Sequence, residues 1–212
     1  MTRTMIAIAI AGFTVSTALA KETKSYELDE VDQIDIAAGV SAKVEIGEEQ
    51  SIIVETDKGD FEDLIIRVED GVLYIKQEWK NNFWNGRKRP NYKVTATVKD
   101  LKSIEASSGS SLAAEGINDG DFTINVSSGS SVRVEGTCGV VSAEASSGAS
   151  LNAKEFRCEN AAADASSGAS LSLFASTKVD AKASSGSSVK VYGSPEDVNA
   201  RKSSGGSISI RD

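Results

Sequence analysis

The sequence predicts an all-β protein, a parallel β-solenoid (β-helix) whose coils are about 19 residues long. A five-residue tag, Ser-Ser-Gly-(Ser/Ala)-Ser, recurs at intervals of 18 to 20 residues. Apolar and polar residues alternate on both sides of each tag, which is typical of β-strands. Aromatic residues make up only 6% of the chain, and this composition suits a narrow core of small side chains.

The tag marks a corner of each coil, where its central glycine supplies the positive φ that a sharp bend needs. Residues three and five positions from this glycine are mostly Ala, Val, Ile or Leu, and residues four positions away are mostly polar. Parallel stacking places each position above its counterpart at about 4.8 Å, so like side chains pack in ladders. Stacked serine hydroxyls can hydrogen-bond along a ladder and to corner carbonyls. The central glycines are Gly109, Gly129, Gly148, Gly168, Gly186 and Gly205.

The first 20 residues have the features of a secretory signal peptide. A basic start precedes an apolar run at residues 5–15, and Ala18-Leu19-Ala20 matches a cleavage site. The apolar run is shorter than the roughly 20 residues of a membrane-spanning helix, and no later stretch is long and apolar enough to span a membrane. We expect an exported protein in the periplasm, at the cell surface or outside the cell, with one domain over residues 21–212. Residues 21–29 are polar, and we expect them to be loose.

The segment before the repeats contains a diverged coil and an inserted hairpin. Residues 31–47 alternate as the later repeats do, with Gly39 in the place of the tag glycine, so we expect a first coil here. Residues 51–98 hold further strands, an aromatic and basic loop, and a hairpin at Asp70-Gly71, a dipeptide that favours a type I′ turn. The Ser-Ser-Gly repeats occupy residues 101–212.

The two cysteines occupy equivalent positions in adjacent coils. Cys138 lies ten residues before Gly148, and Cys158 lies ten residues before Gly168. Stacked neighbours about 5 Å apart are within reach of a disulfide, and an exported protein meets oxidising conditions. We therefore predict a Cys138–Cys158 disulfide, with two free thiols as the alternative.

The charge and composition argue against several classes of function. The net charge of −8 and the pI near 4.8 disfavour nucleic acid and anionic membranes as partners. The chain contains no histidine, which excludes Ser-His-Asp and Cys-His nucleophile systems and histidine metal sites. We expect no enzymatic activity, no cofactor and no bound metal.

Acidic residues recur four positions before the corner glycines. This ladder can be compared with the carboxylate pairs of polysaccharide enzymes, or with a calcium site. An asparagine interrupts it, and a lysine and an arginine end it, which favours ordinary pairing of solvated charges. The residues in order are Glu105, Asn125, Glu144, Asp164, Lys182 and Arg201.

A loop at residues 79–92 concentrates aromatic and basic side chains in a chain that is otherwise acidic and poor in aromatic residues. These side chains could hold a sugar, a lipid headgroup or a partner protein. Alternatively, the loop folds over the N-terminal end of the solenoid and caps its core. The candidate ligand-binding residues are Trp79, Phe83, Trp84, Arg87, Lys88, Arg89 and Tyr92.

The last repeat departs from the pattern at Lys202, which stands at an inward position where earlier repeats have small residues. A charged residue there could discourage pairing between sheet edges. Alternatively, the exposed end coil pairs with another copy and forms a homo-oligomer. The sequence leaves both alternatives open.

Several parts of the chain, taken in order, resemble a known family. They are the signal peptide, the coil around Gly39, the Asp70-Gly71 hairpin, the strand at 92–98 with Asp100-Leu101 after it, the Ser-Gly-Ser corners, and Gly116-Ile117-Asn118. Over about residues 28–212 the chain resembles the putative auto-transporter adhesin head GIN domain family, a bacterial domain of unknown function. The resemblance implies an exported bacterial protein with a right-handed β-helix and no established catalytic residues.

These observations predict a non-enzymatic, exported binding module of the cell envelope or surface, adhesin-like, with an envelope glycan or protein as its partner. The second hypothesis is a structural envelope solenoid without a specific ligand. The third is a polysaccharide-acting enzyme.

Overall fold

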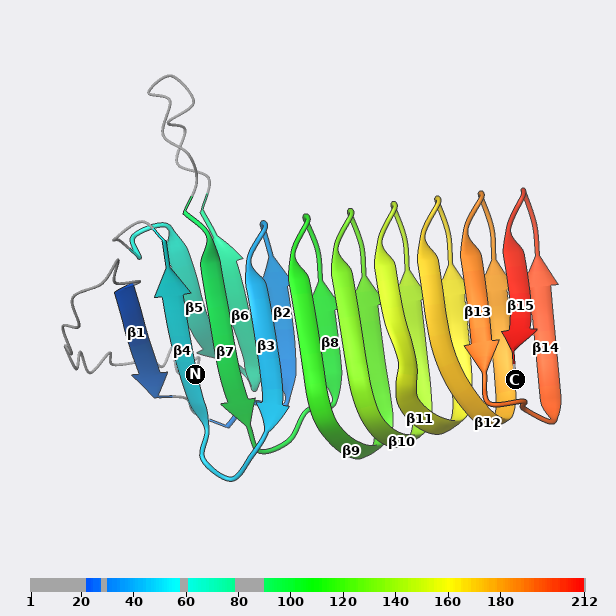
Figure 1. Cartoon of the computed structure of the whole chain (residues 1–212), viewed down its shortest axis with the longest axis horizontal. Coiled ribbons are helices and arrows are strands. Elements are labelled where there is room, and N and C mark those ends of the chain that lie inside the picture. The colour runs from blue at the N-terminus through cyan, green and yellow to red at the C-terminus, as the bar shows by residue number, and fades with distance from the viewer. Residues whose placement is uncertain (1–21, 28–29, 58–60, 79–89, 212) are drawn as a thin grey trace, which may run out of the picture.

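The computed structural model describes residues 22–27, 30–57, 61–78 and 90–211, and every regular element in these ranges is a β-strand (Figure 1). The strands stack side by side along the long axis of the molecule. The prediction of an all-β solenoid is confirmed. The predicted signal peptide lies outside the described residues. The described part of the chain contains no helix that is long and apolar enough to cross a membrane.

The strands fall into a short-stranded N-terminal part and a repetitive C-terminal part. The four strands β9 to β12 are much longer than the others, at 14 to 16 residues. In chain order the strands are β1 (Glu22–Glu27), β2 (Gln33–Ala37), β3 (Ser41–Ile46), β4 (Ser51–Thr56), β5 (Leu64–Glu69), β6 (Val72–Gln77), β7 (Tyr92–Val98), β8 (Ser103–Ala106), β9 (Ser111–Val126), β10 (Ser131–Ala145), β11 (Ser150–Ala165), β12 (Ser170–Ala183), β13 (Ser188–Tyr192), β14 (Asp197–Lys202) and β15 (Ser207–Arg211).

Each coil contributes one strand to a front layer and one to a rear layer, as seen in Figure 1. The long strands β9 to β12 start in the front layer and bend into the rear layer, where their second halves pair again in parallel. The front layer also contains β3, β13 and β15, and the rear layer contains β2, β8 and β14. The register keeps equivalent residues together, as in Ser131 beside Ser150 and Ala145 beside Ala165.

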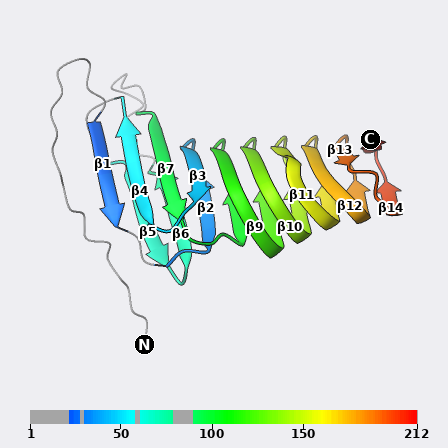
Figure 2. The same ribbon diagram turned by 60° about the horizontal axis from the view of Figure 1, so that its bottom comes forward.

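The N-terminal insertion extends both layers beyond the first coil (Figure 2). In the front layer, β7 pairs in parallel with β3, and β4 and β1 follow in antiparallel order. In the rear layer, the β5–β6 hairpin joins β2 through β6, which confirms the predicted hairpin. The expectation that residues 21–29 are loose is wrong for residues 22–27, which form β1. This strand covers the edge of β4, and Tyr26 packs against the core.

The corners are type I′ turns with positive φ at two consecutive residues rather than at the glycine alone. At one corner Ser147 has φ 53° and Gly148 has φ 71°, and the Ala149 N–H donates to the Ser146 carbonyl at 3.1 Å. The same pair of positive φ values occurs at every tag and in the Asp70-Gly71 turn. A Cβ on Gly148 would meet no atom within 4 Å, so conformation alone requires this glycine.

The fourth residue of each tag faces inward, which the sequence analysis did not identify. Ser110, Ser130 and Ser187 are buried at this position, and the middle corners have buried alanines. The Ser110 hydroxyl donates to the Ile36 carbonyl at 3.1 Å, and the Ser187 hydroxyl donates to the Ala165 carbonyl at 2.7 Å. Each of these positions is therefore a buried site that takes either alanine or a serine, and a buried hydroxyl needs a hydrogen-bond partner.

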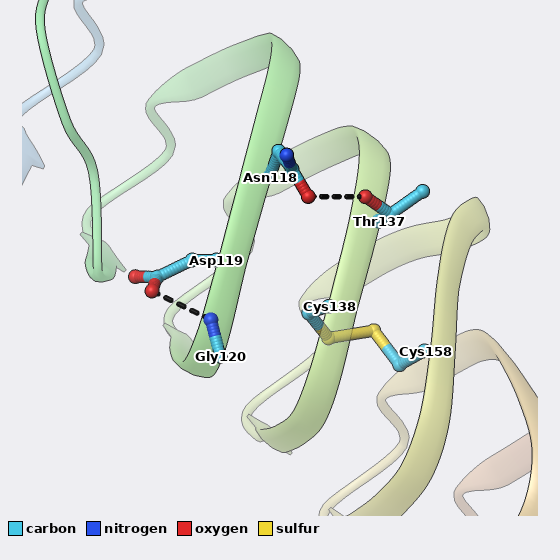
Figure 3. Close-up of a disulfide and its surroundings, with 6 residues drawn as sticks. All are labelled: Asn118, Asp119, Gly120, Thr137, Cys138 and Cys158. Carbon is cyan, nitrogen blue, oxygen red and sulfur yellow. Dashed lines mark hydrogen bonds between the residues drawn. A yellow bond between two sulfur atoms is a disulfide. The ribbon is translucent and has the colours of Figure 1, made fainter.

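The two cysteines form the predicted disulfide between adjacent coils (Figure 3). Cys138 and Cys158 are register partners in β10 and β11, and their Cα atoms are 4.4 Å apart. Both side chains are buried. The disulfide thus adds a covalent link where the ladder already aligns the two coils.

Replacing a corner glycine with alanine should destabilise the protein although there is room for the methyl group. We expect Gly148→Ala to lower the free energy of unfolding by about 1–2 kcal/mol, because alanine is strained at positive φ. Gly120→Ala is the matched control, since Gly120 has equally open surroundings but no positive φ. That control should be neutral or slightly stabilising. Denaturant unfolding measures both variants, and equal effects would contradict the corner mechanism.

Removing the disulfide should lower the free energy of unfolding by about 3 kcal/mol, because the bond restricts the unfolded chain. The test compares the native protein with the Cys138→Ala/Cys158→Ala double variant by denaturant unfolding. A reductant should destabilise the native protein and leave the double variant unchanged. Intact mass measured after alkylation without reductant should show no modified thiol, and two alkylated thiols would contradict the bond.

Candidate binding groove

A groove of about 470 Å³ lies on the rear layer beside the corners. It spans four consecutive coils, from β8 to the second half of β11. Its lining contains three carboxylates, one amide and three serine hydroxyls. The residues are Glu105, Asn125, Val126, Ser127, Glu144, Ala145, Ser146, Asp164 and Ser166.

The alternation of the strands builds the groove. Side chains four and two positions before each corner glycine point to the same outer face, and the residue between them points into the core. The first set forms a row of three carboxylates interrupted by Asn125, and the second set forms a row of serines. Val126 and Ala145 between them are buried. Four coils at about 4.8 Å place the outermost carboxylates roughly 14 Å apart.

The structure extends the carboxylate row toward the N-terminus. Asp35 is the register partner of Glu105, and Tyr74 is the register partner of Asp35. Tyr74 lies between two cations, with Arg67 at 4.7 Å and Lys76 at 5.0 Å from its ring centroid. The Lys76 ammonium also pairs with Asp35 at 2.8 Å. Cations therefore flank the acidic centre of the row on its N-terminal side, as Lys182 and Arg201 do on the other side.

The sequence spacing also places Asp35 in the carboxylate row, although the sequence analysis did not include it. Asp35 stands four residues before Gly39, which is the position of the acidic ladder in the later repeats. Tyr74 and Arg67 belong to the inserted hairpin, and the repeat spacing carries no information about them. Their place in the row follows only from the pairing of β6 with β2.

The three carboxylates of the groove have no ion-pair or hydrogen-bond partner within the described part of the chain. Glu144 and Asp164 are direct register partners, so two like charges stand on adjacent strands. Like charges directly opposite one another destabilise a sheet. The expected pairing of solvated charges along this ladder is therefore absent in the groove.

Several charged residues elsewhere on the described surface form ion pairs. On the front layer, the Lys43 ammonium lies 2.8 Å from Glu45 and 3.1 Å from Glu115. The hydrogen bonds that this ammonium donates to Glu45 and Glu115 hold the pKa of Lys43 above its usual value. Lys102 contacts Asp32 and Asp100, and a hydrogen bond to Asp32 is the main cause of its raised pKa. These ion pairs contrast with the groove, where three carboxylates have no such partner in the described part of the chain.

The groove offers hydrogen-bond acceptors and negative charge to a ligand. Carboxylates accept strong hydrogen bonds from hydroxyl and ammonium groups, and serine hydroxyls can donate or accept. Among the described residues, no group of three His, Cys, Asp or Glu side chains is arranged to hold a metal ion.

The predicted loop site remains a prediction for six of its seven residues. Trp79, Phe83, Trp84 and the basic residues Arg87, Lys88 and Arg89 lie outside the described residues. Tyr92 is described, and it belongs to β7, where it is 3% exposed and stacks on Phe61 with 6.4 Å between the ring centroids. Tyr92 is therefore part of the core in this structure.

Three solved structures share the fold over nearly the whole chain. A putative adhesin from Bacteroides fragilis matches with a TM-score of 0.73 at 17% identity, covering 93% of this chain and 100% of its own. A putative adhesin from Parabacteroides merdae matches with a TM-score of 0.53 at 12% identity, covering 90% and 96%. A putative lipid binding protein from Parabacteroides distasonis matches with a TM-score of 0.51 at 19% identity, also covering 90% and 96%.

The comparison with family models agrees with the order of parts in the sequence. No match was found among curated proteins. One family model matches residues 30–195, a range that includes the inserted hairpin, the groove and the disulfide. Because this match covers well over half of the chain, the protein belongs to the family described as putative auto-transporter adhesin, head GIN domain.

Proposed function

We propose that this protein is a non-enzymatic, adhesin-like binding module that is exported to the cell envelope and holds a glycan in the groove. The observation that carries the proposal is the set of unpaired carboxylates that line the groove. Sugar hydroxyls can donate hydrogen bonds to these carboxylates, and an amino sugar would add a complementary positive charge. The backbone of four hydrogen-bonded coils fixes the positions of these groups before a ligand binds, which lowers the entropic cost of binding.

The cost of the carboxylate row favours binding over a purely structural role. Stacking Glu144 beside Asp164 without a counter-charge weakens the sheet, and a structural solenoid gains nothing from that arrangement. A ligand that supplies hydrogen-bond donors or positive charge would offset the repulsion. The structural envelope solenoid remains the second candidate, because the regular corners and the disulfide stabilise the fold independently of any ligand.

The lining of the groove also narrows the class of ligand. An acyl chain needs a mostly apolar pocket. The groove presents carboxylates, an amide and hydroxyls instead. We therefore favour a polar ligand over a lipid tail, although one protein of similar fold is described as a putative lipid binding protein. Export is supported by the predicted signal peptide and by the disulfide, which is typical of oxidising compartments.

Neutralising two groove carboxylates should abolish or strongly weaken glycan binding. We expect Glu144→Gln/Asp164→Asn to reduce affinity at least about tenfold on an array of envelope glycans, because each lost charge-assisted hydrogen bond contributes about 1.5–3 kcal/mol. Glu159→Gln is the matched control, since Glu159 is exposed on the same strand but does not line the groove. A second variant, Trp79→Ala/Trp84→Ala, tests the loop. Binding that is lost only in this second variant would place the site in the loop instead.

The same carboxylate variant should be more stable than the native protein. Removing the repulsion between stacked like charges should raise the free energy of unfolding by about 0.2–1 kcal/mol. Thermal or denaturant unfolding without ligand measures this change. A loss of stability would indicate that the carboxylates support the fold, and would favour the structural candidate.

A further inference from the structure

The last coil exposes two apolar residues whose counterparts in the preceding coil are buried. Val198 and Ile210 are each 42% exposed, whereas Val179 and Val191, their register partners in the preceding coil, are fully buried. Strand β14 pairs with β12 and strand β15 pairs with β13, and no described strand pairs with their other edges (Figure 1). Among the described residues, this end of the solenoid therefore presents an unpaired edge in both layers, together with the end of the apolar core.

We propose that this C-terminal edge binds the same edge of a second copy of the chain in a two-fold symmetric, antiparallel arrangement. The inference is independent of the proposed glycan site. It rests on the exposed core, on the open backbone edges and on the charge pattern of the edge strand.

The charge pattern of the edge strand is self-complementary. Residues 196–202 read Glu-Asp-Val-Asn-Ala-Arg-Lys, with two acids at one end and two bases at the other. When this segment pairs with its own copy in antiparallel register centred on Asn199, Asp197 stands opposite Arg201 and Glu196 stands opposite Lys202. Directly opposed residues of paired strands share a face, so unlike charges meet on both sides of the centre.

The same register also buries the exposed apolar residues. Val198 comes to lie opposite Ala200 of the second copy, and both positions face the inner side of the layer. The last corner turn runs from Ser203 to Gly206. Asn199 lies four residues before this turn and Ile210 lies four residues after it, so the two residues are at about the same height in their layers. A two-fold axis through Asn199, perpendicular to the layers, therefore brings Ile210 beside Ile210 of the second copy. The apolar core would continue across the interface.

This register changes the interpretation of Lys202. The sequence left open whether a lysine at this inward position discourages edge pairing or the end coil pairs with another copy. In the structure Lys202 is exposed at the open end. In the proposed dimer it has Glu196 of the second copy as its partner, so it selects the antiparallel register and disfavours registers in which it meets another cation. Asp197 already pairs with Lys178 at 3.0 Å, which holds this carboxylate at the edge.

Analytical ultracentrifugation over a range of protein concentrations tests the proposal. The purified protein should form a dimer with a Kd on the order of 10–100 µM, because the end of a two-layer solenoid is smaller than most stable interfaces. High salt, about 1 M NaCl, should weaken the dimer by screening the exposed ion pairs. This measurement needs no variant.

Charge reversal at each half of the edge strand makes the test specific. Arg201→Glu/Lys202→Glu leaves an entirely acidic edge, and Glu196→Lys/Asp197→Lys leaves an entirely basic edge. Each variant alone should dimerise at least about tenfold more weakly, and an equimolar mixture should form heterodimers. Lys99→Glu/Lys154→Glu is the control, because it changes the net charge as much as the first variant at exposed sites away from the edge. Circular dichroism establishes that each variant is folded.

Three outcomes would overturn the proposal. The first is a native protein that stays monomeric up to about 1 mM, where even a weak specific dimer would be visible. The second is a dimer that the edge reversals leave unchanged, or a mixture of the two variants that fails to associate. The third is growth into ever larger species, which would indicate head-to-tail stacking instead of a closed dimer.

Discussion

Each coil of this protein reverses direction through two consecutive residues with positive φ, and the rest of the structure depends on that turn. The turn is short, so the two strands that it joins lie directly across the core from one another. It is also hydrogen-bonded to the turns above and below it, as when the Gly129 N–H donates to the Ser147 carbonyl at 3.0 Å. Corners that stack in this way keep every coil in the same register. The inward ladders, the disulfide and the groove all follow from that register.

The register of the repeats and the Asp70-Gly71 hairpin could be predicted from the sequence, whereas pairing between distant segments that do not repeat could not. The distance of each residue from its corner glycine identified the inward ladders and placed Cys138 beside Cys158. In parallel stacked coils, residues at the same distance from their corner glycines lie next to one another. The same distances could not show that residues 22–27 form β1 on the edge of β4, since that pairing joins two unrelated segments. The inward direction of the fourth tag residue was also missed, because a turn interrupts the alternation of the strands.

The candidate site illustrates the same division. The carboxylate ladder was visible in the sequence, but whether neighbouring charges pair depends on side-chain geometry that the spacing does not contain. Asp164 and Lys182 are register partners, yet no ion pair joins them among the described contacts. The aromatic loop attracted attention because its composition departs from the rest of the chain. Tyr92, the one described residue among its candidate ligand-binding side chains, has a place in the core that composition could not indicate.

In a solenoid of nearly identical coils, the neighbouring coils supply the hydrogen bonds and packing contacts that each coil needs. In two places here the neighbouring coils do not supply a favourable partner. In the groove, stacking places carboxylates beside carboxylates. At the C-terminal edge, the last described coil has no neighbouring strand among the described residues on one side. Both proposals supply the missing partner, a ligand in one case and a second copy in the other. They are also geometrically compatible, because a two-fold axis perpendicular to the layers keeps both rear layers on one side of the dimer. The two grooves would then face the same surface, and a dimer could bind a multivalent glycan more tightly than either groove alone.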